Sequence, residues 1–135
     1  KVFIDTDVIL DFLFDRTPFS EQSSRLLSLC EKGEIHGYVT SITLSNIYYL
    51  LRKTASHEKV IDSIKLLLKI IDVKTTDKKT VIEALNSGFK DFEDALQNFS
   101  AQNDEKISVI ITRNIRDYKL SDLSIMTPEA FLKVN

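Results

Sequence analysis

Five short acidic side chains stand in three separate segments of the chain. They are Asp5, Asp7, Asp91, Asp94 and Asp117. The first two directly follow an apolar run, and the middle two are three positions apart, which places them on one face of a helix. Clustered carboxylates repel: two unit charges 4 Å apart cost about 4 kcal/mol at an effective dielectric of 20. Carboxylate oxygens are also the ligands that hard divalent cations prefer, so the pattern indicates a site for Mg²⁺ or Mn²⁺.

Each of these carboxylates also has an ordinary structural explanation when it is taken alone. Asp5 and Asp91 are well placed to cap the helices that follow them, and Asp94 lies in a first helical turn, where negative charge is favourable. Asp117 suits a turn. The metal site becomes the better interpretation only when the segments are considered together.

The elements that must position these residues alternate between strand and helix. Short apolar runs predict strands over residues 2–4, 35–39, 70–73, 109–111 and 125–126. Helical patterns cover residues 6–14, 18–33, 41–54, 57–68, 77–88, 91–103 and 128–132; Thr17, Ser56, Thr76 and Thr127 are their expected caps, and Pro18 is a first helical residue. This order predicts one domain over residues 1–135, a three-layer α/β/α sandwich with a mainly parallel sheet of four to five strands.

Open parallel sheets bind ligands beyond the carboxyl ends of their strands. The first predicted strand is followed by Asp5, the second by Thr40 and Ser41, and the strand over residues 109–111 by Thr112. We therefore expect these polar residues to meet at one edge of the sheet.

The composition excludes several classes of protein. In 135 residues, 43% are hydrophobic and 28% are charged, with a net charge of −2, so nucleic acid would have to bind to a local basic face.

Neither a membrane span nor a signal peptide is visible, which predicts a cytoplasmic protein. The lone Cys30 reads as a small buried hydrophobe, and His36 and His57 have no ligand spacing.

Two motifs resemble those of the PIN domain family. Residues 94–97 read Asp-Ala-Leu-Gln, and residues 112–117 read Thr-Arg-Asn-x-x-Asp, with 18 positions between their starts. The opening residues 2–7 and the closing residues 127–132 are also similar to the family pattern, so the resemblance covers essentially the whole chain.

The resemblance implies a metal-dependent ribonuclease of the VapC-like toxin group, with RNA as substrate, an antitoxin protein as partner, and a homodimeric assembly. Position by position, it implies that Asp5, Asp94 and Asp117 are catalytic and bind Mg²⁺ or Mn²⁺. Asp91 and Asp7 are candidates for further metal ligands, and the accessory residues of the site are Thr112, Asn114, Asn46 and Ser41. The basic residues expected to contact RNA are Arg113, Arg116, Lys119, Arg52 and Lys53.

The chain departs from the family pattern at two positions. Asn46 stands where the family usually has a glutamate of the metal site, and Asp7 stands where Asn is more frequent. A catalytically degenerate domain that binds RNA or protein is therefore an alternative, and it predicts weak metal binding. A second alternative is a haloacid dehalogenase-like phosphatase, which Asp5-x-Asp7 also resembles. Tyr48, Tyr49 and Leu50 are candidates for contact with a partner helix.

Overall fold

The core of the fold is a five-stranded parallel sheet. The computed structural model describes residues 1–134. Its strands are β1 (Val2–Ile4), β2 (Gly37–Thr40), β3 (Asp72–Lys74), β4 (Val109–Ile111) and β5 (Ser124–Met126). They pair in the order β3-β2-β1-β4-β5, and every pair is parallel. The carboxyl ends of β1, β2 and β4 therefore lie side by side at one edge.

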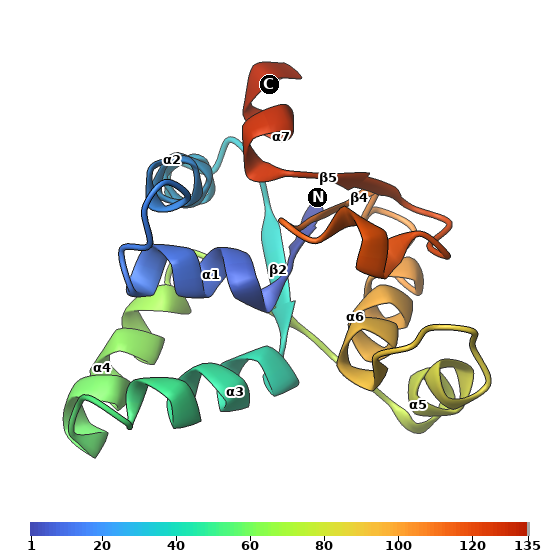
Figure 1. The fold of residues 1–135 in the computed structure, drawn as a ribbon, viewed down its shortest axis with the longest axis horizontal. Helices are drawn as coiled ribbons and strands as arrows, with labels where there is room; N and C mark the ends of the chain where they lie inside the picture. Colours follow the sequence, from blue (N-terminus) through green and yellow to red (C-terminus); the bar gives the residue numbers. More distant parts are fainter. Residues whose placement is uncertain (135) are drawn as a thin grey trace.

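Helices cover both faces of the sheet. They are α1 (Thr6–Leu13), α2 (Ser20–Glu31), α3 (Ser41–Leu51), α4 (His57–Leu67), α5 (Lys78–Leu85), α6 (Phe92–Gln102), α7 (Pro128–Val134) and the short 3-10 helix η1 (Ile115–Tyr118). Figure 1 shows α1 to α4 on one side of the sheet and α5 and α6 on the other, while α7 packs against α2. The predicted three-layer α/β/α sandwich is confirmed.

Burial of both sheet faces explains the apolar strands. Side chains alternate along a strand, so Ile4 points into the layer of α1 and α2, whereas Phe3 packs with Ile110 and Tyr118 on the opposite face. All three residues of β1 are buried, as expected for a strand at the centre of a covered sheet. Cys30 is buried in the first of these two core clusters, as predicted.

The predicted start of the second helix is wrong. Residues 17–19 form a turn with a cis peptide before Pro18, and α2 begins at Ser20, whose backbone N–H donates to the carbonyl oxygen of Arg16 at 2.7 Å. Phe19 is 40% exposed as a result. The end of the helix agrees with the prediction, because Gly33 adopts a φ of 76° just beyond it.

Two other helix starts need smaller corrections. The cap of α5 is Asp77, which accepts a hydrogen bond from the backbone N–H of Thr80 at 2.9 Å, and Thr76 instead pairs with the hydroxyl of Ser100. The predicted helix over residues 91–103 has Asp91 as its cap, and Phe92, the first residue of α6, is exposed. Within residues 1–134, no helix has the length and apolar character needed to cross a membrane.

Candidate metal centre

Asp5 is held at the carboxyl end of β1 by three donors from different elements. Its Oδ1 accepts hydrogen bonds from the backbone N–H of Thr6 at 2.8 Å and from Gln97 Nε2 at 3.0 Å. Its Oδ2 accepts from the hydroxyl of Thr112 at 2.7 Å. Burial raises the pKa of Asp5, and the hydrogen bonds from Thr112 and Gln97 act in the opposite direction. Asp5 therefore caps α1, as its structural explanation predicts, and also faces the other acids.

Asp94 lies in the first turn of α6, close to the other carboxylates. Its Oδ1 accepts a long hydrogen bond of 3.4 Å from the hydroxyl of Tyr118. Burial, together with the negative charges of Asp5, Asp91 and Asp117, raises the pKa of Asp94 to about 7. The three predicted metal ligands thus lie near enough for Asp94 to respond to the charge of both others.

Asp91 and Asp117 flank Asp94 at the surface. Asp91 caps α6 by accepting a hydrogen bond from the backbone N–H of Asp94 at 2.9 Å. Asp117 is exposed on η1. Both line, with Asp94, a pocket of about 250 Å³ whose wall also includes Arg116 and Lys119.

A buried network of neutral polar groups lies beneath these acids. Gln97, with no exposed surface, donates from Nε2 to Asp5 and also to the Tyr118 hydroxyl at 3.0 Å. Its Oε1 accepts from Thr43 at 3.2 Å and from Thr6 at 3.5 Å. Burial raises the pKa of Tyr118, as do the charges of Asp5 and Asp94, so this hydroxyl keeps its proton. The network fixes the position of Asp5 relative to α6.

Asn46 on α3 contacts Glu93, a residue for which the sequence analysis predicted no role. Its Nδ2 donates a short hydrogen bond to Glu93 Oε1. The other oxygen of Glu93 accepts from the hydroxyl of Thr6 at 3.3 Å. Burial raises the pKa of Glu93, and the charge of Asp5 adds to the effect. Glu93 is therefore a sixth carboxylate in this region.

Asp7 lies two residues after Asp5, in the first turn of α1, and contacts the β4–η1 loop. Its Oδ2 accepts a hydrogen bond of 2.7 Å from Asn114 Nδ2, while its buried Oδ1 has no hydrogen-bond partner among residues 1–134. Burial, and then the charge of Asp5, raises the pKa of Asp7 to about 7. The backbone N–H of Asn114 donates to the Thr112 hydroxyl at 3.0 Å. Asn114 therefore connects this loop to Asp7 directly and to Asp5 through Thr112.

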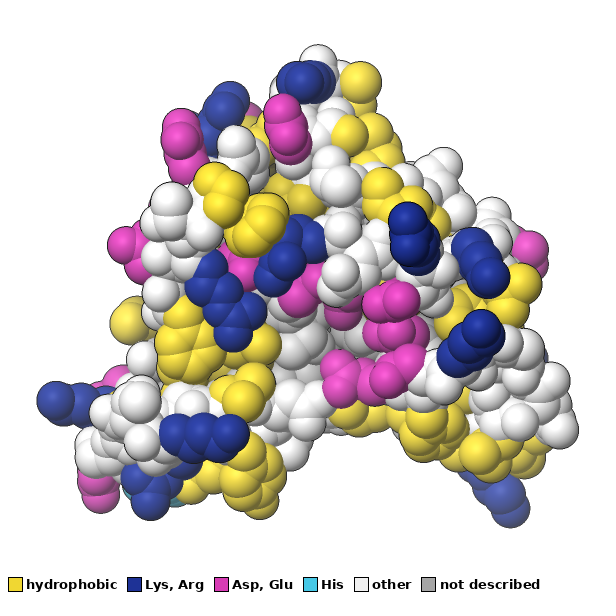
Figure 2. Space-filling model, viewed as in Figure 1, with side chains coloured by type: hydrophobic (Ala, Val, Ile, Leu, Met, Phe, Trp, Pro, Cys, Tyr) yellow, Lys and Arg dark blue, Asp and Glu magenta, His cyan; other side chains and the backbone are white. Residues whose placement is uncertain are grey.

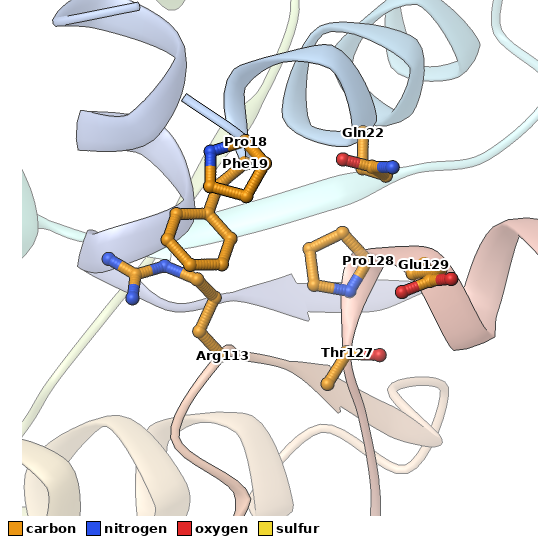
Figure 3. Close-up of a pocket in the computed structure, with 7 residues that line it drawn as sticks. All are labelled: Pro18, Phe19, Gln22, Arg113, Thr127, Pro128 and Glu129. Carbon is orange, nitrogen blue, oxygen red and sulfur yellow. The ribbon is translucent and has the colours of Figure 1, made fainter. Parts of the chain in front are cut away.

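The structure gives Arg113 a partner other than RNA. Its Nε and Nη2 donate to the two oxygens of Asp11 at 2.6 and 3.1 Å, and Asp11 is fully buried. Its guanidinium also lies 4.1 Å from the centre of the Phe19 ring. Figure 3 shows this stack at one wall of a pocket that contains Pro18 and Pro128. Arg113 thus fixes the start of the β4–η1 loop to α1.

The other predicted residues differ in their distance from the acids. Arg116 and Lys119 are exposed beside them. Arg52 and Lys53 follow the far end of α3, 11 residues after its start, which is about 16 Å along the helix axis. Ser41 is exposed at the start of α3, and Thr43 is the hydroxyl of this segment that joins the network.

Tyr49 is the most exposed of the three residues considered for partner contact. It is 67% exposed, whereas the Tyr48 hydroxyl pairs with His57 Nδ1 at 2.8 Å and Leu50 packs against the core.

The donor set fits a hydrated Mg²⁺ or Mn²⁺ ion. Figure 2 shows acidic side chains gathered near the middle of one face, with basic side chains on either side. Within residues 1–134, none of Asp5, Asp91, Glu93, Asp94 and Asp117 forms an ion pair, so their charge is not neutralised by a side chain. No three acidic, histidine or cysteine side chains in that range are close enough to chelate one ion together. Mg²⁺ commonly takes one or two carboxylates and keeps several waters, which suits this arrangement.

Gln97, Thr6, Thr43 and Glu93 are site residues that the sequence analysis missed. The periodicity of α6 offered one signal, because Gln97 is three positions after Asp94 and therefore lies on the same face of the helix. Glu93 offered none, since an acid in a first helical turn is ordinary.

Comparison with known proteins gives consistent results. The sequence model of the PIN domain matches residues 1–116. Ribonuclease VapC1 of Aquifex aeolicus (strain VF5) is 29% identical over 139 aligned positions, which cover 97% of this chain and 92% of that protein.

Two solved structures share the fold. A toxin–antitoxin complex from Klebsiella pneumoniae has a chain with a TM-score of 0.69 and 17% identity, covering 95% of this chain and 98% of its own. VapBC2 from Rickettsia felis, bound to a DNA fragment from its promoter, has a chain with a TM-score of 0.66 and 14% identity. The match covers 92% of this chain and 96% of that chain. With a family match over residues 1–116, the resemblance found in the sequence is confirmed, and the chain belongs to the PIN domain family.

Proposed function

We propose that this protein is a Mg²⁺- or Mn²⁺-dependent ribonuclease and the toxin of a toxin–antitoxin pair. One observation carries the enzymatic part: several carboxylates without a cationic partner meet at the carboxyl edge of the sheet, and burial together with their charges raises the pKa of Asp94 to about 7. A divalent cation is the ligand that such a group of acids favours. The similarity to ribonuclease VapC1 supports RNA as the substrate.

In this proposal Asp5, Asp94 and Asp117 hold the ion, directly or through water. A bound divalent ion supplies Lewis-acid chemistry, because it makes water more acidic and neutralises charge on a phosphate. Thr112 and Gln97 keep the Asp5 carboxylate in place through hydrogen bonds of 2.7 and 3.0 Å. Arg116 and Lys119, exposed beside the acids, bind the phosphates of the RNA backbone.

The test combines binding with catalysis. The melting temperature of the wild-type protein should rise with millimolar Mn²⁺, since a ligand at 100 times its Kd adds about 2.7 kcal/mol to stability. Cleavage of a single-stranded RNA should require the ion and should be lost in Asp94→Asn. If Mn²⁺ shifts neither the melting temperature nor the RNA pattern, the proposed function is wrong.

The toxin assignment includes an antitoxin partner, and the two structural relatives are chains of toxin–antitoxin complexes. It is tested by expression: wild-type protein should arrest growth of a host cell, and Asp94→Asn should not. The homodimer stays a prediction, which sedimentation of the purified protein checks.

The non-catalytic alternative is kept for a specific reason. Asn46 occupies the α3 position near the acids and brings no charge of its own. That alternative predicts wild-type protein that binds RNA but does not cleave it with any divalent ion. Membership of the PIN domain family argues against the phosphatase alternative.

A further inference from the structure

The hydrogen bond from Asn46 to Glu93 joins two helices that lie in opposite layers of the fold. α3 belongs to the layer of α1 and α2, and α6 to the layer on the other side of the sheet (Figure 1). The two side chains are 47 positions apart in the sequence. Both helices start near the carboxyl edge of the sheet, where the acids gather.

We propose that Glu93 is a metal-binding carboxylate of this site and that Asn46 is the positioning residue that holds it there. The inference rests on the proposed metal-dependent function and adds a ligand to it. α6 then contributes two neighbouring acids, and the charge absent from α3 at position 46 is supplied across the site by α6.

Glu93 and Asp94 contact different residues of the site. Glu93 Oε2 accepts from the Thr6 hydroxyl at 3.3 Å, and Thr6 is the residue whose backbone N–H binds Asp5. Asp94 instead faces Tyr118 and Asp117. Two consecutive acids of α6 therefore have different hydrogen-bond partners within the same site.

The burial of Glu93 also needs an explanation. It is partly buried beside Asp5 and Asp94, forms no ion pair within residues 1–134, and receives only an amide and a hydroxyl as donors. Neutral donors do not cancel its charge, so repulsion between the acids persists in the metal-free protein. A bound cation removes that repulsion.

The structure offers a matched control for the test. Glu83 on α5 is partly buried as well and accepts a hydrogen bond from the side-chain amide of Asn103 at 3.1 Å. It thus has the same kind of partner as Glu93, but it is not among the acids of the site. Glu83→Gln and Glu93→Gln make the same chemical change, and only the second removes charge from the proposed centre.

The experiment is calorimetric titration of each metal-free protein with Mn²⁺, alongside its melting temperature without metal. We expect Glu93→Gln to weaken Mn²⁺ binding by about 10- to 100-fold, and Glu83→Gln to leave it unchanged. Equal affinities of Glu93→Gln and wild type would overturn the inference and leave the proposed function standing. If the wild type itself binds no Mn²⁺, the proposed function fails.

A charge-swapped variant keeps the test decisive if the single variant folds poorly. The double variant Asn46→Glu/Glu93→Asn retains an amide–carboxylate pair and the same net charge, with the carboxylate moved to α3. Recovery of most of the lost Mn²⁺ affinity supports the assignment. An affinity as low as that of Glu93→Gln in a folded double variant overturns it.

Discussion

The Thr112 hydroxyl donates a 2.7 Å hydrogen bond to Asp5 Oδ2 across 107 positions of sequence. The two residues follow β4 and β1, which are adjacent parallel strands paired from Val2 with Val109 to Ile4 with Ile111. The register of the sheet alone therefore brings the first acid of the chain to the Thr-Arg-Asn segment. The site depends on this pairing before any ion is bound.

Thr112→Val tests the contribution of that bond. The variant removes a donor from a buried carboxylate and an acceptor from the backbone N–H of Asn114. An unpaired buried polar group costs about 1–3 kcal/mol. We therefore expect the free energy of unfolding, measured in urea, to fall by that amount. Thr112→Ser keeps the hydroxyl and should lose much less. An unchanged unfolding midpoint in Thr112→Val would show that the bond contributes nothing to stability.

Asp94→Asn should have opposite effects on stability and on metal binding. The pKa of Asp94 is raised to about 7 by burial and by its acidic neighbours, so the ionised carboxylate destabilises the metal-free protein. We expect the variant to melt at a higher temperature than wild type at pH 8 in EDTA, and to lose the increase that Mn²⁺ produces. A lower metal-free melting temperature would mean that its hydrogen bond outweighs the repulsion.

The same acids predict how the stability of the metal-free protein depends on pH. Asp94 and Asp7 have folded pKa values of about 7 against an ordinary value of 3.8, so between these values the folded state binds more protons than the unfolded state. Stability must then fall as pH rises from about 4 to about 7 and change little above that. Urea unfolding in EDTA at pH 5 and pH 8 measures this directly. The difference in unfolding free energy between pH 5 and pH 8 should be smaller in Asp7→Asn. Stability that rises with pH would contradict the raised pKa values of both Asp94 and Asp7.

The sequence predicted the layers and the main acids because these follow from local patterns. Apolar runs of three or four residues alternate with helical periodicity, and acids stand directly after one of the runs, which is enough to place them at one edge of a parallel sheet. The start of α2 was wrong because residues 17–19 form a turn, whereas a Thr-Pro pair is also a common helix start. The strand order rests on pairings between distant segments, which local periodicity does not encode.

Side-chain partners within the site were harder to predict than its location. Gln97 and Thr43 are buried polar residues whose partners come from other elements, and neither residue type is diagnostic by itself. Arg113 looked like an RNA contact because it adjoins Thr112. Only the packing of α1 beneath it shows that Asp11 accepts both of its hydrogen bonds.

Arg113→Met should therefore destabilise the protein. Asp11 has no exposed surface, and removal of one partner from a buried ion pair costs about 3–5 kcal/mol. We expect the lower end of that range, because Arg113 is 26% exposed and Arg16 still lies 3.5 Å from Asp11. Thermal unfolding in EDTA measures the loss. Arg116→Met, at an exposed position, should stay within about 0.5 kcal/mol of wild type; an equal effect of the two variants would contradict a structural role for Arg113.

Arg116 and Lys119 should instead affect the binding of RNA. Both are exposed at the rim of the acidic pocket, so their replacement by alanine should leave the melting temperature unchanged. Each phosphate contact removed should reduce the slope of log affinity against log salt by about 0.7 for a single strand. Fluorescence anisotropy with a labelled single-stranded RNA, in EDTA to prevent cleavage, measures that slope. Lys53→Ala is the matched control, because Lys53 lies beyond the far end of α3. An equal loss of slope in Lys53→Ala would place the RNA path along α3 rather than across the pocket.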